Sequence, residues 1–87
     1  MADMLITYDL RTPGQDYEEV YEYLRKLPAR RAQKSVWLAK TTKSAAVISK
    51  DLMKLVDGND RLFVARVDDW SSFGAMNNVA NWLNGKA

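Results

Sequence analysis

The strongest constraint on the fold is a short run of apolar and β-prone residues from Met4 to Tyr8, which ends on a carboxylate, Asp9. The run has almost no polar face, which is typical of a strand that is buried on both sides. We therefore expect a strand that lies centrally in a sheet and ends at Asp9.

A first helix is predicted from about Asp16 to Leu27. Asp16 and Glu19 have the spacing of a capping box, in which each side chain binds a backbone N–H at the start of the helix. Pro28 ends the helix. The apolar positions of this segment follow the helical repeat: Tyr17, Val20, Tyr21, Leu24 and Leu27.

The segment from Arg31 to Thr41 is predicted to be extended, either as one long strand or as two short strands with a bend. Val36 and Leu38 fall on one side of its period-two pattern, and Trp37 falls on the other.

A second helix is predicted after Ser44, a residue type that caps helices, and Gly58 ends it. Its apolar stripe consists of Ala45, Ile48, Leu52 and Leu55. A strand from Arg61 to Val67 and a weak terminal helix within Ala75 to Leu83 complete the chain.

This order of elements predicts one α+β domain over residues 1–87, a ferredoxin-like βαββαβ sandwich with a C-terminal tail helix. Right-handed crossovers place both main helices on one sheet face. The other face needs a cover, which is either a second copy of the chain or the tail that carries Trp70, Phe73, Trp82 and Leu83. The predicted core is Leu5, Ile6, Val20, Leu24, Val36, Leu38, Ile48, Leu52, Leu55, Phe63 and Val64.

The composition limits which kinds of catalytic chemistry are available, because the chain of 87 residues has no His and no Cys. Imidazole and most thiol chemistry are therefore excluded, and hydrolysis would rest on carboxylates that hold a hard metal ion, or on Lys, Tyr or Ser. No apolar stretch is long enough to cross a bilayer and nothing indicates export, so we expect a cytoplasmic protein without membrane contact. Its small size favours self-association.

Asp9 is the best placed carboxylate, and two interpretations of it are open. It opens a turn through local backbone hydrogen bonds, or it is a metal ligand. Asp68 and Asp69 would add carboxylates if the last strand ended near Asp9, although capping of the following turn explains them as well.

Basic residues gather around the predicted end of the first helix, as Arg25, Lys26, Arg30, Arg31 and Lys34. Such a cluster is either a solvated surface or a contact for a nucleic-acid backbone. The start of the same helix carries Glu18, Glu19 and Glu22, which complement the helix dipole but repel phosphate.

Several stretches of the sequence resemble known families. The segment Ile6 to Leu10 (ITYDL), followed by Arg31 to Trp37 (RAQKSVW), resembles CRISPR-associated Cas2 proteins and the related virulence-associated protein D (VapD) ribonucleases. Arg66 to Phe73 (RVDDWSSF) resembles the end of the VapD proteins. The opening from Tyr8 to Tyr17 is similar to a Cas2-like group labelled the SinR family.

The resemblance implies a homodimer in which both copies of Asp9 share Mg²⁺ or Mn²⁺ for endoribonuclease activity. Asp9 is then the metal ligand and catalytic residue, with Arg31 and Ser35 as catalytic partners of the phosphate. The resemblance also places Trp37 near the same cleft. Together with the basic residues, the expected contacts to RNA or another nucleic acid are Arg11, Arg30, Arg31, Lys34 and Trp37. The alternative is a non-catalytic dimeric module that keeps the fold and binds a nucleic acid, a nucleotide or a protein.

Overall fold

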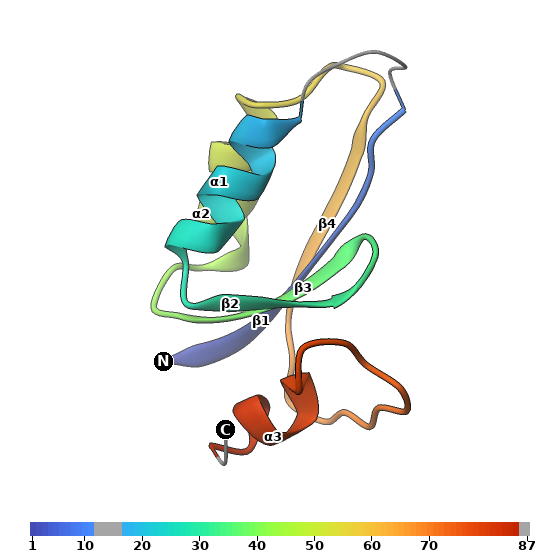
Figure 1. Cartoon of the computed structure of the whole chain (residues 1–87). Coiled ribbons are helices and arrows are strands. Elements are labelled where there is room, and N and C mark those ends of the chain that lie inside the picture. Colours follow the sequence, from blue (N-terminus) through green and yellow to red (C-terminus); the bar gives the residue numbers. More distant parts are fainter. Residues whose placement is uncertain (12–16, 86–87) are drawn as a thin grey trace.

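The computed structural model describes residues 1–11 and 17–85. Its elements are β1 (Ala2–Asp9), α1 (Glu18–Lys26), β2 (Ala29–Gln33), β3 (Val36–Thr41), α2 (Ala45–Met53), β4 (Arg61–Arg66) and α3 (Val79–Leu83), as Figure 1 shows. No helix in the described ranges is long and apolar enough to cross a membrane.

The four strands form one sheet in the order β2-β3-β1-β4, and all neighbours are antiparallel. The strand β1 therefore lies between β3 and β4, as its apolar sequence predicts, and Ile6 pairs with Trp37 on one side and Val64 on the other. This element order and sheet order are those of the predicted ferredoxin-like fold, and that prediction is confirmed.

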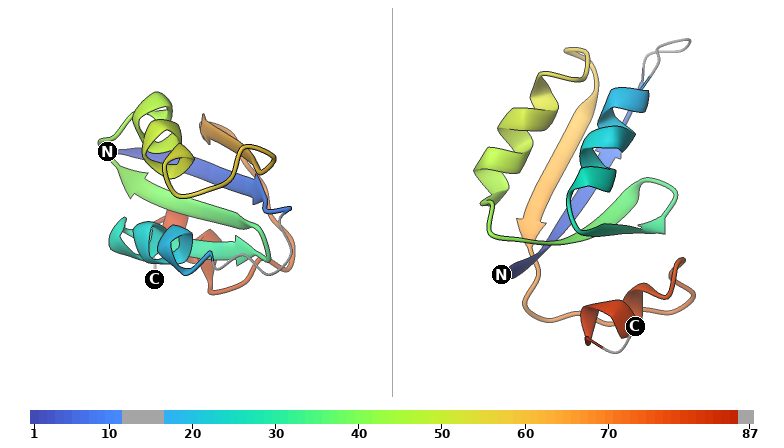
Figure 2. Two further views of the ribbon diagram at one scale, coloured as in Figure 1. Left: turned by 90° about the horizontal axis from the view of Figure 1, so that it is seen from above. Right: turned by 60° about the vertical axis from the view of Figure 1, so that its left-hand side comes forward.

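Both main helices cover the same face of the sheet, side by side (Figure 2). Val20 and Leu24 of α1 and Ile48 and Leu52 of α2 are fully buried there. The sheet contributes Met4, Ile6, Tyr8, Trp37 and Ala39 to the same core. The alternation of a strand explains this set, because residues 4, 6 and 8 of β1 point to one face.

The ends of the helices follow local chemistry. Ser44 caps α2, and its hydroxyl accepts a hydrogen bond of 3.2 Å from the backbone N–H of Val47, as predicted. The helix α1 begins at Glu18. The predicted capping box on Asp16 lies outside the described residues.

The second sheet face is covered in part by the tail. Ala32, Leu38 and Val79 form a smaller buried cluster, against which Leu5, Val36, Val67, Ala75, Trp82 and Leu83 pack. The tail helix α3 thus supplies a cover, as one of the two sequence interpretations expected. Phe73 takes no part, since it is fully exposed in the loop that precedes α3.

The predicted core is confirmed except for Phe63. This side chain is 65% exposed on the edge strand β4, so the prediction is wrong. Its neighbours Leu62 and Val64 face the helices, whereas Phe63 faces the other side, beyond the reach of the tail. Four of the predicted members, Leu5, Val36, Leu55 and Val64, are partly buried at the edges of the two clusters.

The extended segment is a hairpin rather than one long strand. β2 ends at Gln33 and β3 begins at Val36, and the register shifts between Arg31 and Gln33. Irregularities of this kind redirect side chains at the end of a strand pair. Here the turn carries Lys34 and Ser35 to the end of β1, where the backbone N–H of Tyr8 donates to the Ser35 carbonyl at 3.3 Å.

Candidate functional site

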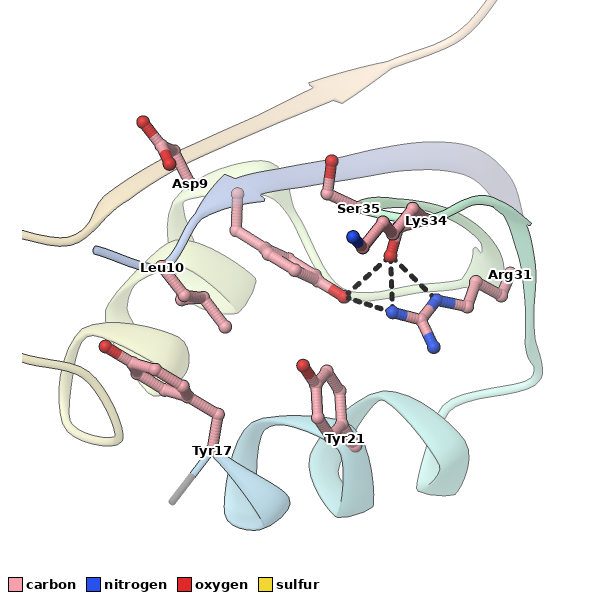
Figure 3. A pocket seen from close by; sticks show the side chains of 8 residues that line it. Asp9, Leu10, Tyr17, Tyr21, Arg31, Lys34 and Ser35 are labelled. Carbon is pink, nitrogen blue, oxygen red and sulfur yellow. Dashed lines mark hydrogen bonds between the residues drawn. The ribbon is translucent and has the colours of Figure 1, made fainter. Parts of the chain in front are cut away.

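A cavity of about 420 Å³ opens between the end of β1, the start of α1 and the hairpin turn (Figure 3). Its lining brings together residues from distant parts of the sequence, among them four that the sequence predicts for the site. The lining residues are Tyr8, Asp9, Leu10, Tyr17, Tyr21, Arg31, Lys34 and Ser35.

Asp9 lies at the last position of β1, opposite Arg61 of β4. Its side chain is 63% exposed, and Arg11 Nε lies 4.0 Å from its carboxylate, the limit for an ion pair. An exposed pair of this kind contributes little to stability. The carboxylate is therefore open to another cation.

Arg31 is held firmly at the opposite end of the cavity. Its Nε donates a hydrogen bond of 2.8 Å to the Lys34 carbonyl, to which Nη2 also donates. Its guanidinium lies 5.4 Å from the centre of the Tyr21 ring and 5.6 Å from that of Trp37. Two cation–π contacts and a backbone acceptor together fix the orientation of this charge.

Tyr8 and Trp37 form the support beneath Arg31. The indole N–H of Trp37 donates to the Tyr8 hydroxyl at 3.1 Å, and Arg31 Nη2 approaches the same hydroxyl at 3.4 Å. Trp37 is only 6% exposed. Its place in the core gives it a supporting contact with Arg31, and leaves little of its ring for a base to stack on.

Asp9 and Arg31 project to different sides of β1. Figure 3 shows the Asp9 side chain and the Ser35 hydroxyl on the side away from α1, and the Arg31 guanidinium on the α1 side. The cause is the alternation of the strand, which turns Tyr8 toward the helices and Asp9 away from them. The predicted site residues thus gather at one strand end, but within one protomer they form two groups.

Asp60 also contributes contacts beside the cavity, although no sequence pattern indicated it. Its carboxylate accepts hydrogen bonds from the backbone N–H of Arg11 at 2.7 Å, the Tyr17 hydroxyl at 2.8 Å and the backbone N–H of Asp57 at 2.8 Å. Burial alone would raise the pKa of Asp60, but these hydrogen bonds outweigh it and hold the pKa below its usual value. No sequence pattern marks this residue for the site, because two of its three partners, Arg11 and Tyr17, lie far along the chain.

The predicted basic contacts are divided between two places. Lys34 and Arg31 line the cavity, and Arg11 follows Asp9. Arg30 lies at the tail, where its guanidinium is 5.3 Å from the Trp82 ring centre and donates to the Asn77 carbonyl at 3.3 Å. Arg30 therefore fastens the tail to β2 and is set apart from the cavity.

Acidic side chains do not form a cluster in the described part of one protomer. Within residues 1–11 and 17–85 there is no group of three or more acidic side chains that could hold an ion. Asp68 and Asp69 do not join Asp9, because β4 runs antiparallel to β1 and the backbone N–H of Val67 donates to the Asp3 carbonyl at the opposite end of the strand. That sequence-based possibility is wrong.

A comparison with protein families identifies the chain. The model of the CRISPR associated protein Cas2 family matches residues 1–74, so the chain belongs to this family. Its members are known generally as nucleases and as users of divalent metals. The match ends before α3, so this helix lies outside the region shared with the family model. No solved structure matches the chain.

Proposed function

We propose that this member of the Cas2 family is a divalent-metal-dependent endoribonuclease that acts as a homodimer. The observation that carries the proposal is the Asp9 carboxylate, which is 63% exposed at the end of the central strand with only a weak ion pair. Family membership supports a nuclease that acts on nucleic acid. The family's usual cytoplasmic setting agrees with the expectation from the sequence.

A shared ion would draw ligands from a second copy. Mg²⁺ and Mn²⁺ prefer several oxygen ligands, and within residues 1–11 and 17–85 no group of three or more acidic side chains could supply them. The carboxylate fits such an ion if a symmetry-related Asp9 faces it, because two close carboxylates repel until a cation lies between them. The family is typically dimeric, which supports this arrangement.

The candidate residues of this chain would have separate roles in the proposed RNA cleavage. A bound Mg²⁺ or Mn²⁺ supplies a Lewis acid and lowers the pKa of a water molecule. Asp9 would hold that ion, and Ser35, whose hydroxyl is on the same side of β1 (Figure 3), would donate a hydrogen bond to the scissile phosphate. Arg31 points to the other side, where it holds a neighbouring part of the RNA strand.

The second candidate is a non-catalytic dimeric binding module. The acidic first turn of α1, with Glu18 and Glu19, favours it because these charges repel an RNA backbone. The lack of a group of three or more acidic side chains within the described ranges favours it as well. Such a module would bind its partner with equal affinity whether or not a divalent ion is present.

The experiment is cleavage of labelled single-stranded RNA by the purified chain, with and without Mg²⁺ or Mn²⁺. We expect metal-dependent cleavage that Asp9→Asn abolishes without unfolding the protein. The matched control is Asp3→Asn, at the other end of the same face of β1, which should cleave like wild type. Equal cleavage by wild type and Asp9→Asn, or none with any ion, would refute the nuclease proposal and favour the binding module.

A further inference from the structure

The cavity on the α1 side of β1 has features that the role of Asp9 does not use. We propose that it binds one nucleotide of a single-stranded RNA, with the phosphate on Arg31 and the base against the ring of Tyr17. This inference deepens the proposed function and rests on it for the choice of RNA as the ligand. It adds a defined subsite beside the proposed metal site.

The size and the lining of the cavity suit a nucleotide. Its volume of about 420 Å³ falls in the range of small-molecule sites. Tyr17 and Leu10 stand on one side and Arg31 on the other, with Tyr21 between them (Figure 3). An apolar and aromatic end therefore faces a cationic end, which matches a ligand with a flat base and a charged phosphate.

The Arg31 guanidinium is already oriented for binding an anion. Nε and Nη2 are engaged by Lys34 and Tyr8, while Nη1 has no hydrogen-bond partner among the described residues. The acid in the cavity lining, Asp9, points away to the other side of β1 (Figure 3). Since the guanidinium is already fixed against Tyr21 and Trp37, binding of a phosphate costs little side-chain entropy.

The Tyr17 ring is already held in position for stacking with a nucleobase. Its hydroxyl donates to Asp60 at 2.8 Å, so the ring is anchored at its polar end beside the cavity. Stacking on an aromatic ring recognises every base by its face, and it needs a base that is free of a duplex. We therefore assign a single strand, with little preference among the four bases.

The test is a titration of the ¹⁵N-labelled full chain with adenosine 5′-monophosphate in the absence of divalent metal, followed by NMR. The indole N–H of Trp37 is a suitable reporter, because it is hydrogen-bonded to the Tyr8 hydroxyl that Arg31 also contacts. We expect saturable shifts of this resonance and of the backbone N–H of Tyr17. Adenosine and inorganic phosphate should each bind about tenfold more weakly, because each lacks one of the two contacts.

Variants separate the two contacts. Arg31→Gln should weaken binding of the nucleotide about tenfold, and Arg31→Lys should lie between it and wild type. The matched control is Arg25→Gln. The Arg25 guanidinium is also close to the Tyr21 ring, at 6.0 Å from its centre, but it does not line the cavity, so this variant should bind the nucleotide like wild type. Tyr17→Leu should weaken binding of the nucleotide but not of phosphate, whereas Tyr17→Phe, which keeps the ring but loses the hydrogen bond to Asp60, should lie between Tyr17→Leu and wild type.

Three results would overturn the inference. The first is the absence of shifts, and the second is equal weakening by Arg25→Gln and Arg31→Gln. The third is phosphate binding as tight as nucleotide binding together with no effect of Tyr17→Leu, which would indicate a simple anion site. Nucleotide binding without RNA cleavage would refute only the nuclease, and metal-dependent cleavage without nucleotide binding would refute only this subsite.

Discussion

The backbone N–H of Arg11 donates a hydrogen bond of 2.7 Å to the carboxylate of Asp60, although the two residues are 49 positions apart in the chain. The same oxygen accepts from the Tyr17 hydroxyl at 2.8 Å. Asp60 therefore joins the chain on both sides of residues 12–16 to the segment that precedes β4. This contact holds the backbone of Arg11, two residues after Asp9.

Asp60→Asn should reduce stability in a pH-dependent manner. The pKa of Asp60 is below its ordinary value of 3.8 in the folded protein, so its ionised form stabilises the fold. That stabilisation is complete above pH 3.8 and is lost as the pH falls through the lower, folded-state pKa. Urea unfolding should therefore show a larger difference between wild type and variant at pH 7 than at pH 2.

The control for this prediction is Asp69→Asn, which changes an exposed carboxylate three residues after the end of β4. Its effect on the free energy of unfolding should be small at both pH values. An equal loss for Asp60→Asn at pH 7 and pH 2 would contradict the assignment of the lowered pKa to these hydrogen bonds.

Tyr8→Phe should destabilise the fold by about 1–3 kcal/mol, because the buried indole N–H of Trp37 loses its acceptor. Urea unfolding measures the difference. Tyr21→Phe is the comparison, since the Tyr21 hydroxyl has no hydrogen bond within the described parts of the chain, and its loss should change stability by less than about 0.5 kcal/mol. Similar losses for both variants would show that the Tyr8 hydroxyl has no special role.

Ser44→Ala should cost about 1 kcal/mol, because the N-cap hydroxyl that accepts from Val47 is removed. Ser49→Ala, within the same helix α2, should be neutral or slightly stabilising, since alanine has the higher helix propensity. Thermal unfolding of the two variants gives the comparison. A Ser44 variant as stable as the Ser49 variant would argue against the cap.

Leu52→Ala should cost about 2–5 kcal/mol, because Leu52 is fully buried between α2 and the sheet and its truncation leaves a cavity. Met53→Ala removes a side chain of similar size that is 64% exposed, and it should cost less than about 1 kcal/mol. Urea unfolding at neutral pH measures both. Equal losses would place the core elsewhere.

Phe63→Glu should weaken the proposed dimer. Phe63 is 65% exposed on the edge strand β4, on the sheet face that the tail leaves open, and a charge there opposes burial against a second copy. Sedimentation at tens of micromolar should show a dimer for wild type and a shift toward monomer for the variant. A wild-type monomer at that concentration would contradict the proposed dimer, and an unchanged dimer in the variant would place the interface elsewhere.

Local patterns predicted the elements well, because each element depends on its own residues. The apolar run before Asp9 specified a central strand, and the stripes of the two helices specified which side chains are buried. Ser44 marked the start of α2 correctly. The burial of Phe63 was predicted wrongly, because an aromatic residue suits a strand whichever sheet face it points to. Whether its face is covered depends on how far the tail extends across the sheet.

The candidate site was less predictable, because its contacts join residues that are distant in sequence. The family resemblance implied that Asp9 and Arg31 belong to one site, and both residues line the same cavity. Their opposite orientations depend on the strand alternation and on the bulge between Arg31 and Gln33. The role of Asp60 arises only when the segment before β4 meets the end of β1.

Tyr8 and Asp9 are neighbours in β1 but face opposite sides of the sheet, so the roles of both residues depend on the register of this strand. A slip of this strand by one residue would bring the carboxylate against the helices and turn the tyrosine toward the open face. The support of Arg31 and the exposed acid would then be lost together. Insertions or deletions within β1 should therefore be far less tolerated than substitutions at most of its individual positions, and they offer a way to disable both sides of the strand in a single step.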